Sequence, residues 1–147
     1  MKVTTIACAI LLLAAGRATA QGSDDVALIR DVVDRFATGI VEADSAALAS
    51  LYAYPEIPFF ATLNGISPGG YLPTLNSGMG FVRMITRMGN AEERFTNVVI
   101  DEAQGVATMR ADYGFYVNGE LSNSGKEMWT LVKTREGWKI VSVIWSQ

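Results

Sequence analysis

Arg110, Asp112 and Glu127 are the residues whose types and spacing could carry out proton-transfer chemistry. The apolar run over 106–117 predicts a strand, and alternation puts Arg110 and Asp112 on the same face of it. Glu127 lies on the adjacent predicted strand and carries a second carboxylate. The same residue types also fit a cross-strand salt bridge among Arg110, Asp112 and either Glu127 or Lys126, which is ordinary on an exposed strand face.

Several kinds of catalytic and metal site are excluded by composition. The chain contains no histidine, which rules out a Ser-His-Asp triad and most zinc sites. Its only cysteine, Cys8, lies in an N-terminal apolar segment, so the rest of the chain can form neither a disulfide nor a thiolate metal site. Carboxylates alone could bind calcium, but no loop has the ligand spacing that this requires. We therefore predict that the protein uses no metal and no cofactor.

Three helices followed by a four-stranded antiparallel meander are predicted to position these residues, an α+β arrangement. Apolar residues at three- and four-residue steps predict a helix of about 17 residues that starts at Asp24 or Asp25. Asp44 or Ser45 begins a second helix that ends before Pro55. The remaining predictions are a helix over 81–88, a strand over 57–63, a turn at 64–65, irregular chain over 71–78, strands over 95–100, 106–117, 127–134 and 138–145, and a hairpin turn at 118–119.

The last predicted strand is apolar on both faces. Strict alternation puts Ile140 and Ile144 on one face and Val141, Val143 and Trp145 on the other. An antiparallel sheet usually leaves one face to water, so a doubly apolar strand indicates that the outer face is covered. A second copy of the chain is the simplest cover, and we predict a homodimer through Val141, Val143 and Trp145. Scattered exposed hydrophobic side chains are the alternative.

Residues 1–20 have the pattern of a secretory signal peptide. A basic start at Lys2 is followed by a mostly apolar stretch and a small-x-small site, which predicts cleavage near Ala20-Gln21. The chain is then exported to the periplasm or secreted, with residues 21–147 as a single domain; an uncleaved membrane tether is the alternative. Removal of the leader leaves fifteen acidic residues against ten basic ones, and such an acidic chain argues against nucleic acid and anionic membranes as partners.

Three segments together resemble the nuclear-transport-factor-2-like superfamily, in its SnoaL-like branch. They are the apolar pattern of the first helix, the A-D-S-A-A-L-A-S-L-Y-A of residues 43–53, and the closing W-T-L-V-K-T-R-E-G-W-K-I-V-S-V-I-W-S of residues 129–146. The resemblance spans nearly all of the predicted domain. It implies a curved antiparallel sheet wrapped around a long N-terminal helix, cone-shaped with a pocket at the open end. The matching residues are core and turn residues, so they specify a fold and not an activity.

The catalytic residues of ketosteroid isomerases, which share this fold, are missing from the corresponding positions. Those enzymes use a Tyr, a base Asp and a protonated Asp, and the match places Phe36, Phe60 and Thr130 there. None of the three can perform the role. Scytalone-dehydratase-like chemistry relies on histidine, which is absent.

Limonene-epoxide-hydrolase-like members use an Arg-x-Asp pair plus a second Asp on the last strand. Arg110 and Asp112 match the pair, but the second Asp falls near Ile144. Glu127 is then the candidate for the missing acid, and the sequence leaves this open. Tyr116 is an even number of residues from Arg110 and Asp112 on the same predicted strand. Alternation therefore puts all three side chains on one face of the sheet, and the sequence does not say which face.

Aromatic residues gather at the ends of the predicted elements, where this fold has its pocket mouth. Tyr and Trp can line an apolar cavity while each offers one hydrogen bond. We predict a pocket for a small, largely apolar ligand or a partner, with no recognisable catalytic set, lined by Tyr52, Phe60, Tyr71, Tyr116 and Trp129. Two alternatives stay open: a hydrolase or lyase that uses Arg110 and Asp112, and a structural accessory dimer whose cone is filled by side chains.

Overall fold

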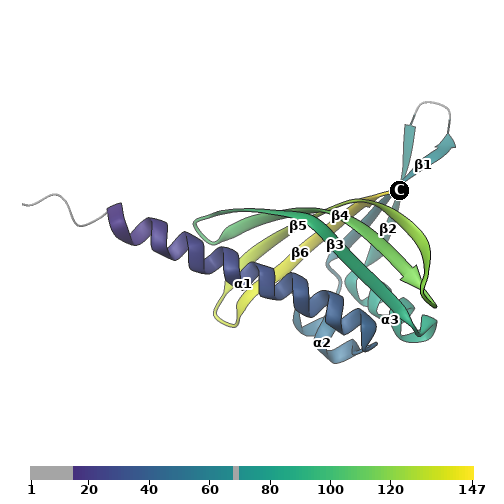
Figure 1. Cartoon of the computed structure of the whole chain (residues 1–147), viewed down its shortest axis with the longest axis horizontal. Coiled ribbons are helices and arrows are strands. Elements are labelled where there is room, and N and C mark those ends of the chain that lie inside the picture. Colours follow the sequence, from purple (N-terminus) through teal and green to yellow (C-terminus); the bar gives the residue numbers. More distant parts are fainter. Residues whose placement is uncertain (1–14, 68–69) are drawn as a thin grey trace, which may run out of the picture.

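The computed structural model describes residues 15–67 and 70–147, which form one curved, unclosed sheet with helices on its hollow face (Figure 1). The long helix α1 runs along that face, and two shorter helices pack at one end of it. The helices are α1 (Ala15–Val41), α2 (Ser45–Ser50) and α3 (Gly78–Met88). The strands are β1 (Pro58–Ser67), β2 (Gly70–Ser77), β3 (Ala91–Ala103), β4 (Val106–Val117), β5 (Glu120–Thr134) and β6 (Gly137–Ser146). The predicted α+β fold is confirmed.

The sheet has six strands in the order β2-β1-β6-β5-β4-β3. The predicted meander forms its β3 to β6 part, and β1 adds to it by pairing in parallel with β6. The predicted turn at 64–65 and the irregular chain at 71–78 are wrong, because these segments form the antiparallel β1–β2 pair. β2 contains Pro73, and a proline in a segment argues against predicting a central strand there. A proline is tolerated in an edge strand such as β2, which is why the strand was not predicted.

Side-chain caps fix the starts of the two short helices. The Asp44 carboxylate accepts hydrogen bonds from the backbone N–H groups of Ala46 and Ala47, as the sequence predicted for α2. The Ser77 hydroxyl accepts one from Gly80 and so begins α3 directly after β2. This abrupt change from strand to helix turns α3 back over the open end of the sheet, where it contacts β1 and β2.

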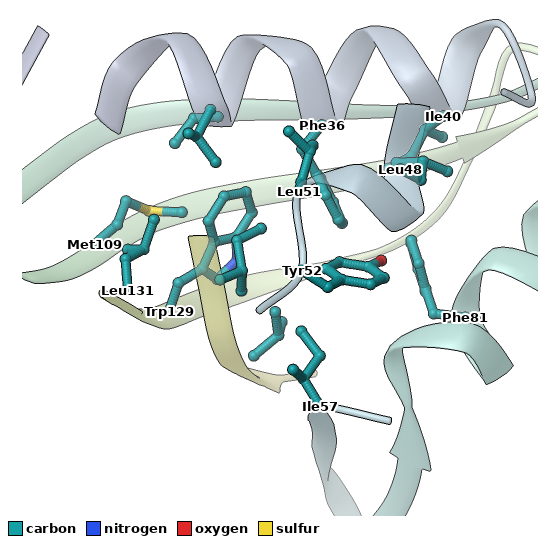
Figure 2. Close-up of a cluster of buried hydrophobic side chains, with 14 of the residues drawn as sticks. Phe36, Ile40, Leu48, Leu51, Tyr52, Ile57, Phe81, Met109, Trp129 and Leu131 are labelled. Atoms are coloured by element: carbon teal, nitrogen blue, oxygen red, sulfur yellow. The ribbon is translucent and has the colours of Figure 1, made fainter. Parts of the chain in front are cut away.

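The core lies between α1 and the inner face of the sheet, and Phe36 is at its centre (Figure 2). The Phe36 ring stacks on Phe81 at 5.6 Å and meets Trp129 edge-on at 4.9 Å. Figure 2 shows Phe36 descending from α1 toward the level of Tyr52 and Phe81. Helix, sheet and α3 therefore share one aromatic cluster, which extends to Phe59 and Phe95.

A β-bulge in the last strand pair reverses the predicted side-chain directions of β6. Thr130 pairs with Ser142 but Leu131 pairs with Ile140, so β6 carries one extra residue at this point. Ile140 and Val143 consequently both face inward and are buried, whereas Ile144 is 44% exposed. The assignment of Val143 and Trp145 to the outer face was therefore wrong, because strict alternation does not continue through the bulge.

The predicted homodimer stays a prediction, but its contact residues change. The large hydrophobic side chains exposed on the outer face include Val99, Met128 and Ile144. Met128 lies directly opposite Ile144, and Arg110 lies between Val99 and Met128 in the strand register. We propose this row as the dimer contact in place of Val143 and Trp145, and the sedimentation coefficient of the chain tests it.

Asp25 anchors the first half of α1 to β5 and β6, the two central strands of the sheet. Its carboxylate accepts hydrogen bonds from Lys133 Nζ at 2.7 Å and from Trp138 Nε1 at 3.1 Å. These two donors, of which Lys133 has the larger effect, lower the pKa of Asp25 below its ordinary value. The helix that the sequence predicts to start here begins earlier, at Ala15, and so contains the predicted cleavage site. Residues 1–14 of the predicted signal peptide lie outside the described residues, and no helix in the described part is long and apolar enough to cross a membrane.

Candidate functional site

A pocket of about 200 Å³ opens between α3 and the inner face of the sheet. Six of its side chains are aromatic, and two methionines of α3 form part of its wall. Its only charged side chains, among those described, are the two glutamates. The lining residues are Phe36, Phe59, Asn76, Phe81, Met84, Met88, Glu93, Tyr113, Phe115, Ser122, Asn123, Glu127, Val143, Trp145 and Gln147.

Glu93 and Glu127 form a buried carboxyl pair in this wall. Their exposed fractions are 6% and 4%, and they come from β3 and β5, with β4 between them. Glu127 lies opposite Ala111 of β4 and Glu93 lies opposite Phe115, so the two acids approach each other across the inner face of β4. The carboxyl groups hydrogen-bond to each other, and Trp129 Nε1 donates a further hydrogen bond to Glu127 Oε1. The indole thus fixes the position of one acid.

The pair holds a proton at pH values where an ordinary glutamate has lost it. Burial raises the pKa of Glu93 well above 4.5, and the neighbouring Glu127 raises it further. Burial also raises the pKa of Glu127, to about 7, against the opposing effect of the hydrogen bond from Trp129. Two like charges in contact away from water cannot both ionise cheaply. Near neutral pH the pair therefore consists of a protonated Glu93 that donates to Glu127.

Two tyrosines complete the polar surroundings of the pair. Tyr113 lines the pocket, and its hydroxyl donates to Asn123 Oδ1 at 2.9 Å. Tyr52 is 5% exposed, and its hydroxyl is the buried side-chain polar atom without a hydrogen-bond partner among the described residues. Burial raises the pKa of Tyr52, and the charges of Glu93 and Glu127 raise it further, which places the hydroxyl within the field of both acids. Figure 2 shows this hydroxyl on the side of the Tyr52 ring that faces Phe81, a residue of the pocket wall.

Arg110 and Asp112, the predicted catalytic candidates, lie on the outer face of the sheet. Inward positions of β4 are buried at every second residue from Ala107, which leaves Arg110 and Asp112 pointing away from the pocket. Asp112 forms an ion pair with Lys126 and accepts a hydrogen bond from Asn97 at 2.7 Å. These partners, of which Asn97 has the larger effect, lower the pKa of Asp112. The structure therefore gives Asp112 the cross-strand salt bridge and does not bring it to Glu127.

The predicted ligand-binding aromatics are also placed outside the pocket wall. Tyr116 is on the outer face, where the Arg94 guanidinium lies 4.1 Å from its ring centre. Phe60 is half-buried, and its neighbour Phe59 takes the inward position on β1. Trp129 is buried behind the pocket wall, where it contacts two of the lining residues, Phe36 and Glu127. The side chain of Tyr71 lies outside the described residues.

Glu93 is the site residue that sequence reasoning missed. The predicted strand started at residue 95, so Glu93 was assigned to no element. The alternation of Ala91, Glu93 and Phe95 carries the signal, because the three share a parity that continues the strand toward its N-terminus. Glu127, Trp129 and Leu131 share a parity on β5 in the same way, and all three are buried on the inner face.

The pair could move protons, and the surroundings do not suggest a metal site. A carboxylic acid next to a carboxylate with a pKa near 7 can donate and accept protons at neutral pH. Within the described residues, no cluster of three or more His, Cys, Asp or Glu could hold a metal ion. The pocket thus combines a largely apolar, aromatic wall with one pair of carboxyl groups that carries a proton.

Comparison with known proteins identifies the fold. No family model and no curated protein matches the chain. Solved structures do: an NTF2-like protein with a cystatin-like fold from Novosphingobium aromaticivorans is 16% identical over 91% of this chain and 88% of that one, with a TM-score of 0.69. A protein of unknown function from Mycobacterium tuberculosis is 14% identical over 86% of this chain and 73% of its own, with a TM-score of 0.68. An NTF2-like protein of unknown function from Silicibacter pomeroyi is 15% identical over 84% of this chain and 96% of its own, with a TM-score of 0.62.

These identities are low, so the likeness concerns the fold alone. The chain has the nuclear-transport-factor-2-like, cystatin-like fold that its sequence predicted. Fold likeness does not transfer an activity, and the function has to be argued from the pocket.

Proposed function

We propose that the protein binds a small, largely apolar molecule in the pocket between α3 and the sheet. The observation that carries this proposal is the unfilled, aromatic-lined space of about 200 Å³ around two buried glutamates. A cavity of roughly 150 Å³ already accepts benzene, so one aromatic ring with a short polar arm is a suitable size. A purely structural dimer domain would have filled this space with side chains, because unfilled core volume costs stability.

Benzyl alcohol is a probe that matches the pocket in size and polarity, and Val143→Phe should abolish its binding. Val143 is buried in the pocket wall, and a larger side chain there occupies the space that the ring needs. Ile144→Phe is the matched control, because Ile144 is the next residue of the same strand and faces outward. Ligand-observed NMR on the full chain measures binding, and thermal unfolding checks that each variant is folded. Equal binding by both variants would place the ligand elsewhere.

A second candidate function, proton-transfer catalysis on the bound molecule, is favoured by the carboxyl pair. Glu127 in its ionised form could take a proton from a carbon next to a carbonyl group, while protonated Glu93 hydrogen-bonds to the carbonyl oxygen. Hydrogen–deuterium exchange at that carbon of phenylacetone in D₂O, followed by NMR, detects the step. We expect Glu127→Gln to reduce the rate by at least tenfold and Asp112→Asn, on the outer face, to leave it unchanged. Exchange no faster than in buffer rejects this candidate.

A further inference from the structure

The two glutamates of the pocket have no cationic partner in the protein. Both are at least nine-tenths buried, and no lysine or arginine is among the described side chains that line the pocket. The sequence places a base beside each acid, Arg94 next to Glu93 and Lys126 next to Glu127, but alternation turns both bases to the outer face. Arg94 is there bound to Glu92 at 2.6 Å, and Lys126 is paired with Asp112. Buried acids are normally paired with a cation, whereas here only the shared proton compensates the pair, and a cation could take the place of that proton.

The walls of the same pocket suit a positive charge as well. Six aromatic rings line the pocket, and the faces of aromatic rings carry a negative potential that attracts ammonium groups. Tyr113 and Asn123 are neutral, and together with the acids they leave the pocket with no positive charge among its described side chains. An anionic ligand would therefore meet the two acids without any compensating group. A cation would meet both the acids and the rings.

The unpartnered hydroxyl of Tyr52 is an independent sign of an incomplete hydrogen-bond network at this place. It is buried, it lacks a partner, and it lies within the field of Glu93 and Glu127. A buried polar atom without a partner is costly, so such atoms usually mark a missing water, ion or ligand. A primary ammonium group has N–H donors, and the two carboxyl groups in the pocket wall can accept them.

We propose that the pocket selects a primary ammonium group carried on a small aromatic or apolar body. This inference rests on the proposed ligand pocket and names the chemical class of its ligand. The ammonium group would lie against Glu93 and Glu127, and its apolar body would lie among the rings of the pocket. Because a cation favours the ionised form of both acids, binding displaces the proton that the pair shares.

Three isosteric probes test the charge preference: benzylamine, benzyl alcohol and benzoate. At pH 7.5 we expect calorimetry to show benzylamine binding at least tenfold more tightly than benzyl alcohol, and benzoate not binding. In buffers of different protonation enthalpy, benzylamine binding should release protons, whereas benzyl alcohol binding should not. The ionisable side chains affected by the charges of the pair include Tyr52 and Tyr113, and both stay neutral at this pH because their pKa values are raised.

Variants separate recognition by the pair from attraction to an acidic protein. The double variant Glu93→Gln, Glu127→Gln should bind benzylamine no more tightly than benzyl alcohol, while Glu92→Gln, on the outer face, should keep the preference. A preference that survives the double variant overturns the inference. Equal binding of benzylamine and benzyl alcohol to the unaltered chain overturns it as well but leaves the pocket proposal standing. If none of the three probes binds, both proposals fail.

Discussion

Replacing Phe36 by Ala should lower the free energy of unfolding by about 3–5 kcal/mol, the range for removing a large buried aromatic side chain. Phe36 is 1% exposed and meets Phe81, Phe95 and Trp129, with ring centres 4.9 to 6.3 Å away. Its loss removes packing between α1, α3 and the sheet at a single point. A domain of this size has a total stability of about 5–15 kcal/mol, so the variant should be close to unfolded in mild denaturant.

The matched control is Phe60→Ala, because Phe60 is half-buried and lies outside this cluster. Urea unfolding followed by tryptophan fluorescence should show a cost of less than about 1.5 kcal/mol for the control. Similar costs for the two variants would contradict the central position of Phe36. Toluene should restore part of the lost stability of Phe36→Ala, since the deletion enlarges an existing pocket and a ligand of the folded state stabilises it.

The elements that the sequence predicted well are those with a strong local pattern. The strand over 106–117 has the observed bounds, because its alternation is regular and an Asn-Gly turn ends it. The inward face of α1 was also predicted, since Ile29, Val33, Phe36 and Ile40 recur at helical spacing and are all buried. In these places the local propensity and the tertiary packing favour the same structure.

The pocket could not be predicted because it depends on contacts between distant parts of the chain. Glu93 and Glu127 are on strands that are not neighbours, and they meet across β4, where they lie opposite Phe115 and Ala111. The bulge that turns Val143 inward arises from the pairing of β5 with β6. The residue types of β6 do not indicate where it occurs. The sequence therefore identified Glu127 as a candidate but gave it the wrong partners, Arg110 and Asp112, on the opposite face.

The stability of the protein should fall as the pH rises from about 5 to 8, which is the reverse of the usual effect of carboxylates. In the folded state Glu127 has a pKa of about 7, and in the unfolded chain its pKa returns to the ordinary 4.5. Between these values the folded state binds more protons than the unfolded state, so the free energy of unfolding decreases with increasing pH. The stabilisation is complete below the unfolded pKa and is lost as the pH rises through the folded one. Its size is on the order of 3 kcal/mol.

Two features of the chain make this pH range easy to interpret. The sequence contains no histidine, so the side chains that ordinarily titrate here are absent. Asp25 and Asp112 have lowered pKa values, and their contributions are lost only in stronger acid, below the unfolded value of 3.8. Glu93, whose pKa is also raised, acts in the same direction as Glu127 and extends the slope toward higher pH.

Urea unfolding at pH 5, 6, 7 and 8 measures the slope. Glu127→Gln should reduce it, and the double variant Glu93→Gln, Glu127→Gln should flatten it, because the raised pKa of Glu93 also makes the folded state bind more protons in this range. A neutral amide at position 127 can still accept the hydrogen bond from Trp129, but it does not ionise. The single variant should therefore be more stable than the unaltered protein at pH 8 and no more stable at pH 5. Asp112→Asn should leave the slope between pH 5 and 8 as it is. A flat profile for the unaltered protein would show that the two acids do not share a proton, since a buried pair that stays fully ionised gives no slope in this range.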